Sequence, residues 1–182
     1  MEIQNEEYLH VTHPLLEDFK KESEKFKEEA EKIYKNNMLL EWLSKQIYNE
    51  GWKVLGTRYE GKTLLNESIL EHCPVLTSFF KKYEPYIYSL AYSSLNPGTE
   101  IFPHFDRKSP HDVLRCHLGL IIPQGDCKLK VNGKEKKWNE GEFLIFDDSF
   151  IHEAWNHTNE KRIVLLIDLH RSKIFNDLDK TA

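Results

Sequence analysis

The 182-residue chain has no apolar run near the roughly 18 residues that predict a membrane-spanning helix. Its first residues, MEIQNEEYLHVTHP, lack the basic start and apolar segment of a secretory signal. Cysteine is scarce: Cys73, Cys116 and Cys127 are odd in number and have no CxxC spacing, which excludes a zinc knuckle or disulfide framework. These absences predict a cytoplasmic protein with reduced thiols and no membrane partner.

Positive charge is also too scattered to form a basic patch. The chain has 25 Lys and Arg against 30 Asp and Glu, a formal net charge of −5 and a pI of about 6.0. Domains that bind nucleic acid gather positive charge on one face, so we expect no nucleic-acid partner. The length predicts a single domain over residues 1–182, and the sequence leaves the oligomeric state open.

A helical pattern, of one helix or a helix pair, is present over residues 14–48. Its apolar residues recur mostly every three, four or seven positions: Leu15, Phe19, Phe26, Ala30, Ile33, Leu40 and Ile47. The charged run KKESEKFKEEAEK between them is typical of a solvated helix face with ion pairs one turn apart. We therefore predict a helical cover over residues 1–50. A second helical stretch, at about 65–83, is expected to break at Cys73-Pro74, since proline removes an N–H donor.

Residues 51–175 are predicted to form a β core. Residues 51–59 and 86–95 read as strands, and further strands follow as LRCHLGLII, CKLKV, EFLIF and RIVLLIDL. Turn signals separate them, and Asn132-Gly133 is a strong hairpin signal. This pattern predicts a mainly β fold, a double-stranded β-helix of the cupin-like jelly-roll type with flanking N-terminal α-helices.

Two histidines and one aspartate are candidate metal ligands. His104 and Asp106 form an HxD pair at a predicted strand end, and His152 belongs to a later strand. Two His and one carboxylate hold one face of a mononuclear iron(II) octahedron and leave the other face open for O2 and an organic co-substrate. A His–Asp hydrogen bond and a surface histidine are the structural alternatives, but the barrel pattern favours the metal. The other histidines considered are expected to be exposed: His10, His13, His72, His111 and His157.

Iron of this type needs electrons from an organic reductant such as 2-oxoglutarate. Arg162 lies ten residues after His152 at a strand start, where its guanidinium either clamps a distal carboxylate or faces solvent. Asp147 and Asp148 either orient a ligand histidine through its second ring nitrogen or form a turn.

Arg115 and His117 lie two apart on one predicted strand and share a face. If that face points inward, burying a cation requires an anion, which favours contact with an acidic co-substrate or an acidic substrate. If it points to solvent, the core is filled by the alternate residues Leu114, Cys116 and Leu118.

The segments HFD, RCHLGLIIP, KWNEGEFLIFDDSFIHEAWN and RIVLLIDL together resemble the aspartyl/asparaginyl β-hydroxylase family of iron- and 2-oxoglutarate-dependent oxygenases. The resemblance runs from about Trp52 to Leu169 and implies Fe(II), 2-oxoglutarate and O2. It implies His104 and His152 as iron ligands. The positions that match the family's co-substrate residues are Ser93, Arg115, His117 and Arg162.

One departure from the family pattern is informative. The animal peptide hydroxylase has glycine at the position of Asp106, whereas several bacterial relatives keep the HxD, so the complete triad resembles the bacterial branch. A carboxylate ligand also argues against halogenation. The longer stretch before Arg115 predicts that the loop 107–113 shapes a different substrate pocket.

The function expected is hydroxylation of an unactivated carbon at an iron held by His104, Asp106 and His152. The resemblance implies the β-carbon of an Asp or Asn residue in a peptide or protein, and a free amino acid or a peptide natural product stays open. Desaturation, epimerisation or cyclisation would use the same cofactors. The alternative from another class is a non-catalytic cupin-like module that binds a metal or a small acid.

Overall fold

The computed structural model describes residues 6–106 and 113–179. The strands are β1 (Leu40–Glu41), β2 (Trp52–Tyr59), β3 (Lys62–Thr63), β4 (Ile87–Leu95), β5 (Thr99–His104), β6 (Val113–Ile121), β7 (Cys127–Val131), β8 (Lys134–Lys136), β9 (Phe143–Phe146), β10 (His152–Asn156) and β11 (Arg162–His170). The helices are α1 (Pro14–Lys21), α2 (Ser23–Lys35), α3 (Glu67–His72), α4 (Pro74–Tyr83) and α5 (Arg171–Asp179), with short 3-10 turns at Lys45–Ile47 and Glu84–Tyr86.

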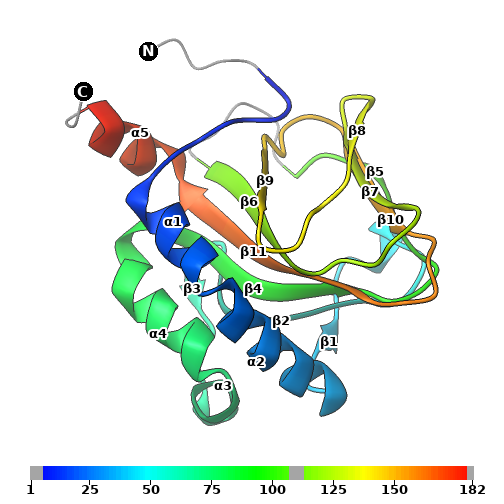
Figure 1. Ribbon diagram of the computed structural model, residues 1–182, viewed down its shortest axis with the longest axis horizontal. Coiled ribbons are helices and arrows are strands. Elements are labelled where there is room, and N and C mark those ends of the chain that lie inside the picture. Colours follow the sequence, from blue (N-terminus) through cyan, green and yellow to red (C-terminus); the bar gives the residue numbers. More distant parts are fainter. Residues whose placement is uncertain (1–5, 107–112, 180–182) are drawn as a thin grey trace.

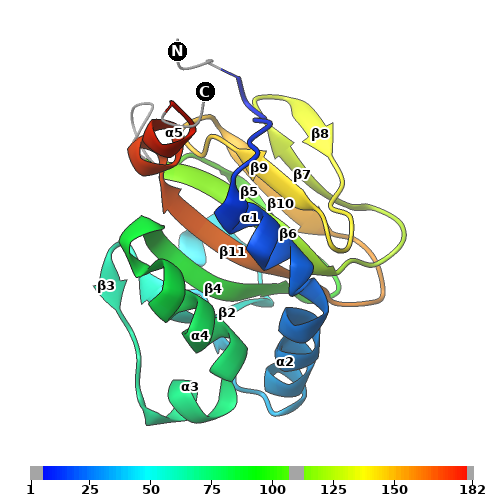
Figure 2. The same ribbon diagram turned by 60° about the vertical axis from the view of Figure 1, so that its left-hand side comes forward.

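The strands form two antiparallel sheets that face each other. The larger sheet has the order β1-β2-β4-β11-β6-β9, with β3 beside β2, and the smaller has the order β5-β10-β7-β8. Helices α1, α2 and α4 cover the outer side of the larger sheet, and the smaller sheet lies on its other side (Figures 1 and 2). The predicted double-stranded β-helix with flanking helices is confirmed.

Strand β11 lies at the centre of the larger sheet, between β4 and β6. Its residues Ile163, Leu165 and Ile167 belong to the apolar cluster under the helices, while Val164 belongs to the cluster between the sheets. A strand covered on both faces is apolar almost without interruption, which explains the run RIVLLIDL. In this run the polar residues Arg162 and Asp168 are therefore conspicuous.

Strand β6 settles which residues fill the core. Leu114, Cys116 and Leu118 pack into the cluster under the helices. Because side chains alternate along a strand, Arg115 and His117 lie on the opposite face, between the two sheets. The interpretation in which both face solvent is wrong.

The predicted N-terminal helix or helix pair is a pair, α1 and α2, and it ends earlier than expected. Helix α2 stops at Lys35, and Asn37 then takes a left-handed backbone with a φ of 52°, a conformation that asparagine tolerates after a helix. Leu40 instead lies on β1, where it pairs with Val54 of β2. Beyond residue 36 the apolar spacing belongs to β1 and to the 3-10 turn at Lys45–Ile47, and no α-helix forms there. The prediction that the helix continues over 36–48 is wrong.

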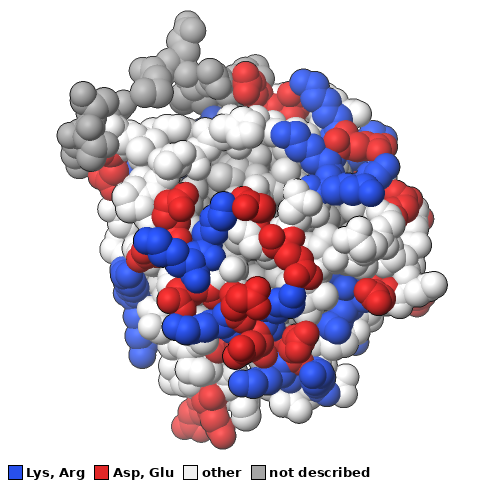
Figure 3. Space-filling view, in the orientation of Figure 1, with Lys and Arg blue, Asp and Glu red and all other residues white. Residues whose placement is uncertain are grey.

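Other local predictions are confirmed. The second helical stretch breaks into α3 and α4 at Cys73-Pro74, and the hairpin of β7 and β8 turns at Asn132 and Gly133, whose φ values of 46° and 81° suit a tight hairpin. On the charged helix face, Lys25 lies 2.6 Å from Glu22, and acidic and basic side chains interleave over this face in Figure 3.

The expectation of exposed histidines is confirmed for His10, His72 and His157 but wrong for His13. His13 is buried, and its Nδ1 accepts a hydrogen bond from the Leu15 N–H and caps α1. His111 and residues 107–112 of the predicted pocket loop lie outside the described residues. Within the described part of the chain, no helix combines the length and apolar character needed to cross a bilayer.

Candidate active site

The three predicted metal ligands lie together at one end of the space between the sheets. His104 ends β5 and His152 begins β10, and these two residues are direct partners in the antiparallel register. Their ring centroids are 4.3 Å apart. Asp106 follows β5, and one ligand atom from each of the three residues lies within 4.8 Å of the others. The register of two strands thus joins residues that are 48 positions apart in the sequence.

Both histidines direct Nε2 toward this cluster, because Nδ1 faces a backbone carbonyl in each of them. The Nδ1 atom of His104 lies 2.7 Å from the carbonyl of Phe102, and that of His152 lies 2.9 Å from the carbonyl of Phe150. A carbonyl only accepts hydrogen bonds, so each Nδ1 carries the proton and each Nε2 keeps its lone pair. The free Nε2 lone pair is the donor that a metal ion requires.

The protonation states of the cluster also suit a cation. His152 is 5% exposed, and burial, followed by the neighbouring His104, lowers its pKa to about 4. Burial alone would raise the pKa of Asp106, but Arg115 and His152 outweigh it and lower the pKa to about 2. At neutral pH the cluster therefore presents a neutral His152 imidazole and a carboxylate, which fits a divalent ion of the iron or zinc type.

The other end of the cavity holds a buried cation without an acidic partner. Arg162 is 1% exposed, its Nη1 donates to the Ser93 carbonyl at 3.0 Å, and its guanidinium lies 4.7 Å from the centre of the Trp138 ring. Among the described residues no carboxylate lies within ion-pair distance of it, and its Nε has no hydrogen-bond partner. Burial lowers the pKa of Arg162 to about 10. Such a group is suited to an anionic ligand.

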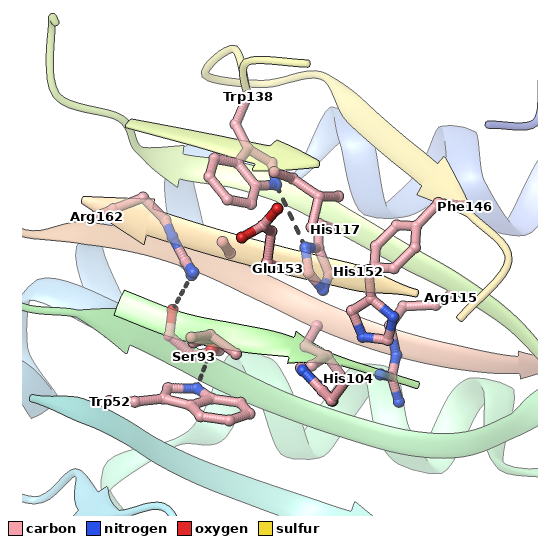
Figure 4. A pocket seen from close by; sticks show the side chains of 14 residues that line it. Trp52, Ser93, His104, Arg115, His117, Trp138, Phe146, His152, Glu153 and Arg162 are labelled. Carbon is pink, nitrogen blue, oxygen red and sulfur yellow. Dashed lines mark hydrogen bonds between the residues drawn. The ribbon is translucent and has the colours of Figure 1, made fainter. Parts of the chain in front are cut away.

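His117 lies between these two ends, and Ser93 lies at the Arg162 end (Figure 4). The Trp138 Nε1–H donates to His117 Nδ1 at 3.3 Å, so the imidazole proton is on Nε2, which is buried without a partner. Burial and the charge of Arg162 lower the pKa of His117 well below its ordinary value. The Ser93 hydroxyl accepts from Trp52 Nε1 at 3.1 Å and keeps its own proton to donate. The cavity thus offers neutral donors beside a cation.

Arg115 has different surroundings. Its Nε and Nη2 donate to the two oxygens of Asp168 at 2.9 and 3.0 Å, Nη2 lies 3.1 Å from Asp148, and Nη1 contacts Asp106. Burial alone lowers the pKa of Arg115, but Asp168 and Asp148 raise it well above its ordinary value. This arginine therefore already has carboxylate partners.

The cavity is lined by most of the residues that the sequence analysis singled out. They are Ser93, His104, Arg115, His117, His152 and Arg162. Of the two alternatives for Asp147 and Asp148, the turn is confirmed, with the Phe150 N–H donating to the Asp147 carbonyl at 3.4 Å, and the orienting role is excluded because backbone carbonyls take both Nδ1 protons. Asp147 instead pairs with Arg171 at 3.0 Å, and Asp148 pairs with Arg115.

Three residues of the site were not singled out from the sequence. Trp138 contacts both Arg162 and His117, and Trp52 holds the Ser93 hydroxyl. Asp168 holds Arg115. A signal was available for Asp168, because an acidic residue inside a buried apolar run is rare unless it is paired.

Comparisons of the sequence with known proteins point to one family. A sequence model described as aspartyl/asparaginyl beta-hydroxylase matches residues 5–172. The human aspartyl/asparaginyl beta-hydroxylase is 41% identical over 80 residues, which cover 44% of this chain and 10% of the human protein. An ornithine lipid ester-linked acyl 2-hydroxylase of Rhizobium tropici is 39% identical over 106 residues, which cover 57% of this chain and 36% of that protein. The matched region is thus a minor part of each of these relatives.

Solved structures support the fold. A Pseudomonas putida prolyl-4-hydroxylase has a TM-score of 0.54 at 14% identity, over 86% of this chain and 97% of that chain. A Trichoplax adhaerens prolyl hydroxylase, solved with a hypoxia inducible factor peptide fragment, has a TM-score of 0.57 at 15% identity, over 84% of this chain and 79% of that chain.

Proposed function

Because the chain belongs to the aspartyl/asparaginyl β-hydroxylase family, we propose that it is an Fe(II)- and 2-oxoglutarate-dependent dioxygenase that hydroxylates an unactivated carbon. The balanced reaction is substrate C–H plus 2-oxoglutarate plus O2, giving substrate C–OH, succinate and CO2. The observation that carries the proposal is the buried, carboxylate-free guanidinium of Arg162 in the same cavity as the His104, Asp106 and His152 cluster.

The residues present fit both groups. The two Nε2 lone pairs and the Asp106 carboxylate form a donor set for Fe(II) that leaves coordination positions free. A dicarboxylate co-substrate requires hydrogen-bond donors, and the cavity has unpartnered donors in Arg162 Nε and His117 Nε2. A cavity without an anionic ligand would leave these buried donors unsatisfied, which is costly.

Each residue has a binding or orienting part to play. Arg162 anchors the distal carboxylate of 2-oxoglutarate, with the Ser93 hydroxyl beside it, and Trp138 orients both Arg162 and His117. His117 donates from Nε2 to the co-substrate. When bound, the iron and 2-oxoglutarate supply the oxidising chemistry, and the surrounding side chains exclude water from it.

The substrate proposed first is an Asp or Asn residue of a peptide or protein, hydroxylated at the β-carbon. The name of the human relative supports it. A free amino acid or a peptide natural product is the next class to test. The Rhizobium relative is named for an acyl chain, so a lipid belongs in the same panel.

The test is 2-oxoglutarate-dependent succinate formation under air with Fe(II) and ascorbate, across that panel. Wild type is expected to form succinate, and His152→Ala is expected to lose it because the ion loses a ligand. His157→Ala is the matched control, since His157 is exposed and bonds to Glu100 and Asp126 outside the cavity. Mass spectrometry then looks for a gain of one oxygen on the substrate.

The contrary result is also clear. No succinate from wild type, with or without any substrate, would refute the enzymatic proposal and leave a cupin-like binding module. Full activity in His152→Ala would refute the proposed metal ligands. A loss of two hydrogens on the substrate would replace hydroxylation by desaturation.

A further inference from the structure

The metal cluster is most open to solvent on its Asp106 side. The side chains of His152 and His104 are 6% and 13% exposed, whereas that of Asp106 is 33% exposed. Farther along β5, Tyr48 pairs with Ile101 and packs its ring on β2, which closes the gap between the two sheets there. We therefore expect a substrate to approach the metal between the end of β5 and the β2 edge of the larger sheet.

A bulge in β2 decides which of its side chains face this approach. Trp52 lines the cavity, and alternation along the strand places Gly56 on the same face. The register with β4 shifts between Gly56 and Arg58. Arg58 then faces the helices, with its guanidinium 5.8 Å from the centre of the Phe80 ring. Tyr59, the next residue, therefore faces the cavity side again.

Tyr59 lies within electrostatic range of the metal cluster. Burial, followed by the charge of Glu60, raises the pKa of its hydroxyl to about 12, and the charges of Asp106 and Arg115 also act on it. Such effects require charges that are close in space. Tyr59 is nevertheless 40% exposed. An exposed ring beside the proposed iron site is placed to contact the molecule that reacts there.

Trp42 connects Tyr59 with the cavity. The centre of its ring lies 5.3 Å from that of Tyr59, in an edge-to-face contact, and 5.0 Å from that of Trp52, in a stacked contact. Trp42, Trp52 and Tyr59 thus form a continuous aromatic wall. Trp52 is 8% exposed and its Nε1 donates to the Ser93 hydroxyl. The part of the wall left for a substrate is therefore Trp42 and Tyr59.

The surroundings of this aromatic wall are partly apolar and partly charged. Leu40 on β1 is 68% exposed. The next pair in the register, Glu41 and Lys53, is charged, and Glu60 follows Tyr59. A peptide has apolar side chains together with amides that need polar surroundings, so it suits this mixture better than an acyl chain, which is apolar throughout.

We propose that Trp42 and Tyr59 are specificity-determining residues, which bind an apolar side chain beside the hydroxylated residue of a peptide substrate. This inference rests on the proposed function and narrows its substrate class to peptides with a residue such as Phe or Leu next to the target. Burying about half of such a side chain against the two rings corresponds to roughly 10-fold in kcat/KM.

The experiment uses peptides that differ only in the residues flanking a central Asp or Asn. The flanking residues are Phe, Leu, Ala or Glu. Succinate formation with Fe(II), ascorbate and 2-oxoglutarate gives kcat/KM, and tandem mass spectrometry locates the added oxygen on the central residue. Wild type is expected to prefer the Phe- and Leu-flanked peptides over the Ala-flanked peptide by about 10-fold in kcat/KM.

Two variants test whether the aromatic wall provides this preference. Tyr59→Ser and Trp42→Ala are each expected to lower kcat/KM for the Phe-flanked peptide about 5- to 10-fold more than for the Ala-flanked peptide. The reason is that the Phe side chain contacts the rings and the Ala side chain does not. A purely structural effect of either substitution would lower both values by the same factor.

Leu70→Ser is the matched control. Leu70 is 45% exposed, as Tyr59 is to a similar degree, but it lies on α3 in the helical layer (Figure 1). This variant is expected to keep the wild-type preference for Phe flanks. Circular dichroism melts confirm that each variant is folded, and Tyr59→Ser, at the exposed end of β2, provides the test by itself if Trp42→Ala does not fold.

A kcat/KM that is the same for all flanks, or highest for Glu, would overturn the inference. Equal losses for the Phe- and Ala-flanked peptides in Tyr59→Ser would also overturn it, as would turnover of an acyl lipid or a free amino acid but of no peptide. Succinate still forms in each of these cases, so the proposed function stands. No succinate from wild type with any substrate would refute the proposed function itself, and with it the inference.

Discussion

Replacing Arg162 by methionine tests whether the cavity is built for an anionic ligand. Burial lowers the pKa of Arg162 from 12.5 to about 10, which corresponds to about 3 kcal/mol of unfavourable free energy that the folded protein carries with this charge. Methionine has a similar length and removes that cost. The hydrogen bond to the Ser93 carbonyl is lost, which opposes the gain by about 1.5 to 3 kcal/mol.

The two effects nearly cancel, so the free energy of unfolding of Arg162→Met is expected within about 2 kcal/mol of wild type. Arg171→Met is the matched control. Arg171 is also buried but pairs with Asp147 at 3.0 Å, and leaving a buried carboxylate without its partner costs about 3 to 5 kcal/mol. Two buried arginines are therefore expected to respond very differently to the same substitution.

The response to co-substrate completes the prediction. With Mn2+ present and 2-oxoglutarate at about 100 times its Kd, wild type is expected to gain about 2.7 kcal/mol. Loss of the guanidinium weakens binding by about 3 kcal/mol, roughly 150-fold, which leaves Arg162→Met a gain below about 0.5 kcal/mol. Arg171→Met keeps the wild-type gain.

Urea unfolding followed by circular dichroism measures all three proteins with and without 2-oxoglutarate. Equal stabilisation of wild type and Arg162→Met by 2-oxoglutarate would refute the assignment of Arg162. A loss of stability in Arg162→Met as large as in Arg171→Met would show that the reasoning about an unpaired buried charge is wrong.

Two further predictions concern the stability of the helical layer. Glu29 accepts from the Val75 and Leu76 N–H groups at 2.7 and 3.0 Å and from the Tyr92 hydroxyl at 2.7 Å. Glu29→Ala therefore leaves two buried donors and one partly buried donor without this acceptor and should cost about 3 kcal/mol or more in urea unfolding. The exposed neighbour Glu28→Ala should stay within about 0.5 kcal/mol of wild type, and a similar loss in both variants would contradict the prediction. Burial lowers the pKa of His13, so the unfolded chain binds a proton on this residue more readily than the folded protein does. The contribution of His13 to stability is therefore present above its unfolded pKa and is lost as the pH falls below about 6.5. His13→Asn keeps a capping side chain that does not titrate, so wild type should lose stability relative to this variant between about pH 7.5 and pH 5.5, and a difference in Tm that does not change with pH would contradict this.

Much of the fold was predictable because its signals are local. The turn at Asn132-Gly133, the break at Cys73-Pro74 and the apolar run of β11 each depend on residues near one another in the sequence. The end of α2 was mispredicted because the apolar spacing used to predict it is also a local signal. Leu40 and Ile47 continue the apolar spacing of a helix, and only pairing with β2 shows that residue 40 belongs to a strand.

The candidate site was predictable in composition but not in its electrostatics. The ligand types, the HxD spacing and the arginines on two strands could be predicted from the sequence, because these follow from residue identity and alternation along a strand. The tertiary structure establishes the strand pairing that places His104 opposite His152. It also decided that Arg115 lies among three carboxylates while Arg162 has none within ion-pair distance among the described residues. The physical reason is that a charge is stabilised by what surrounds it in space, and the neighbours of these arginines come from strands far apart in the chain.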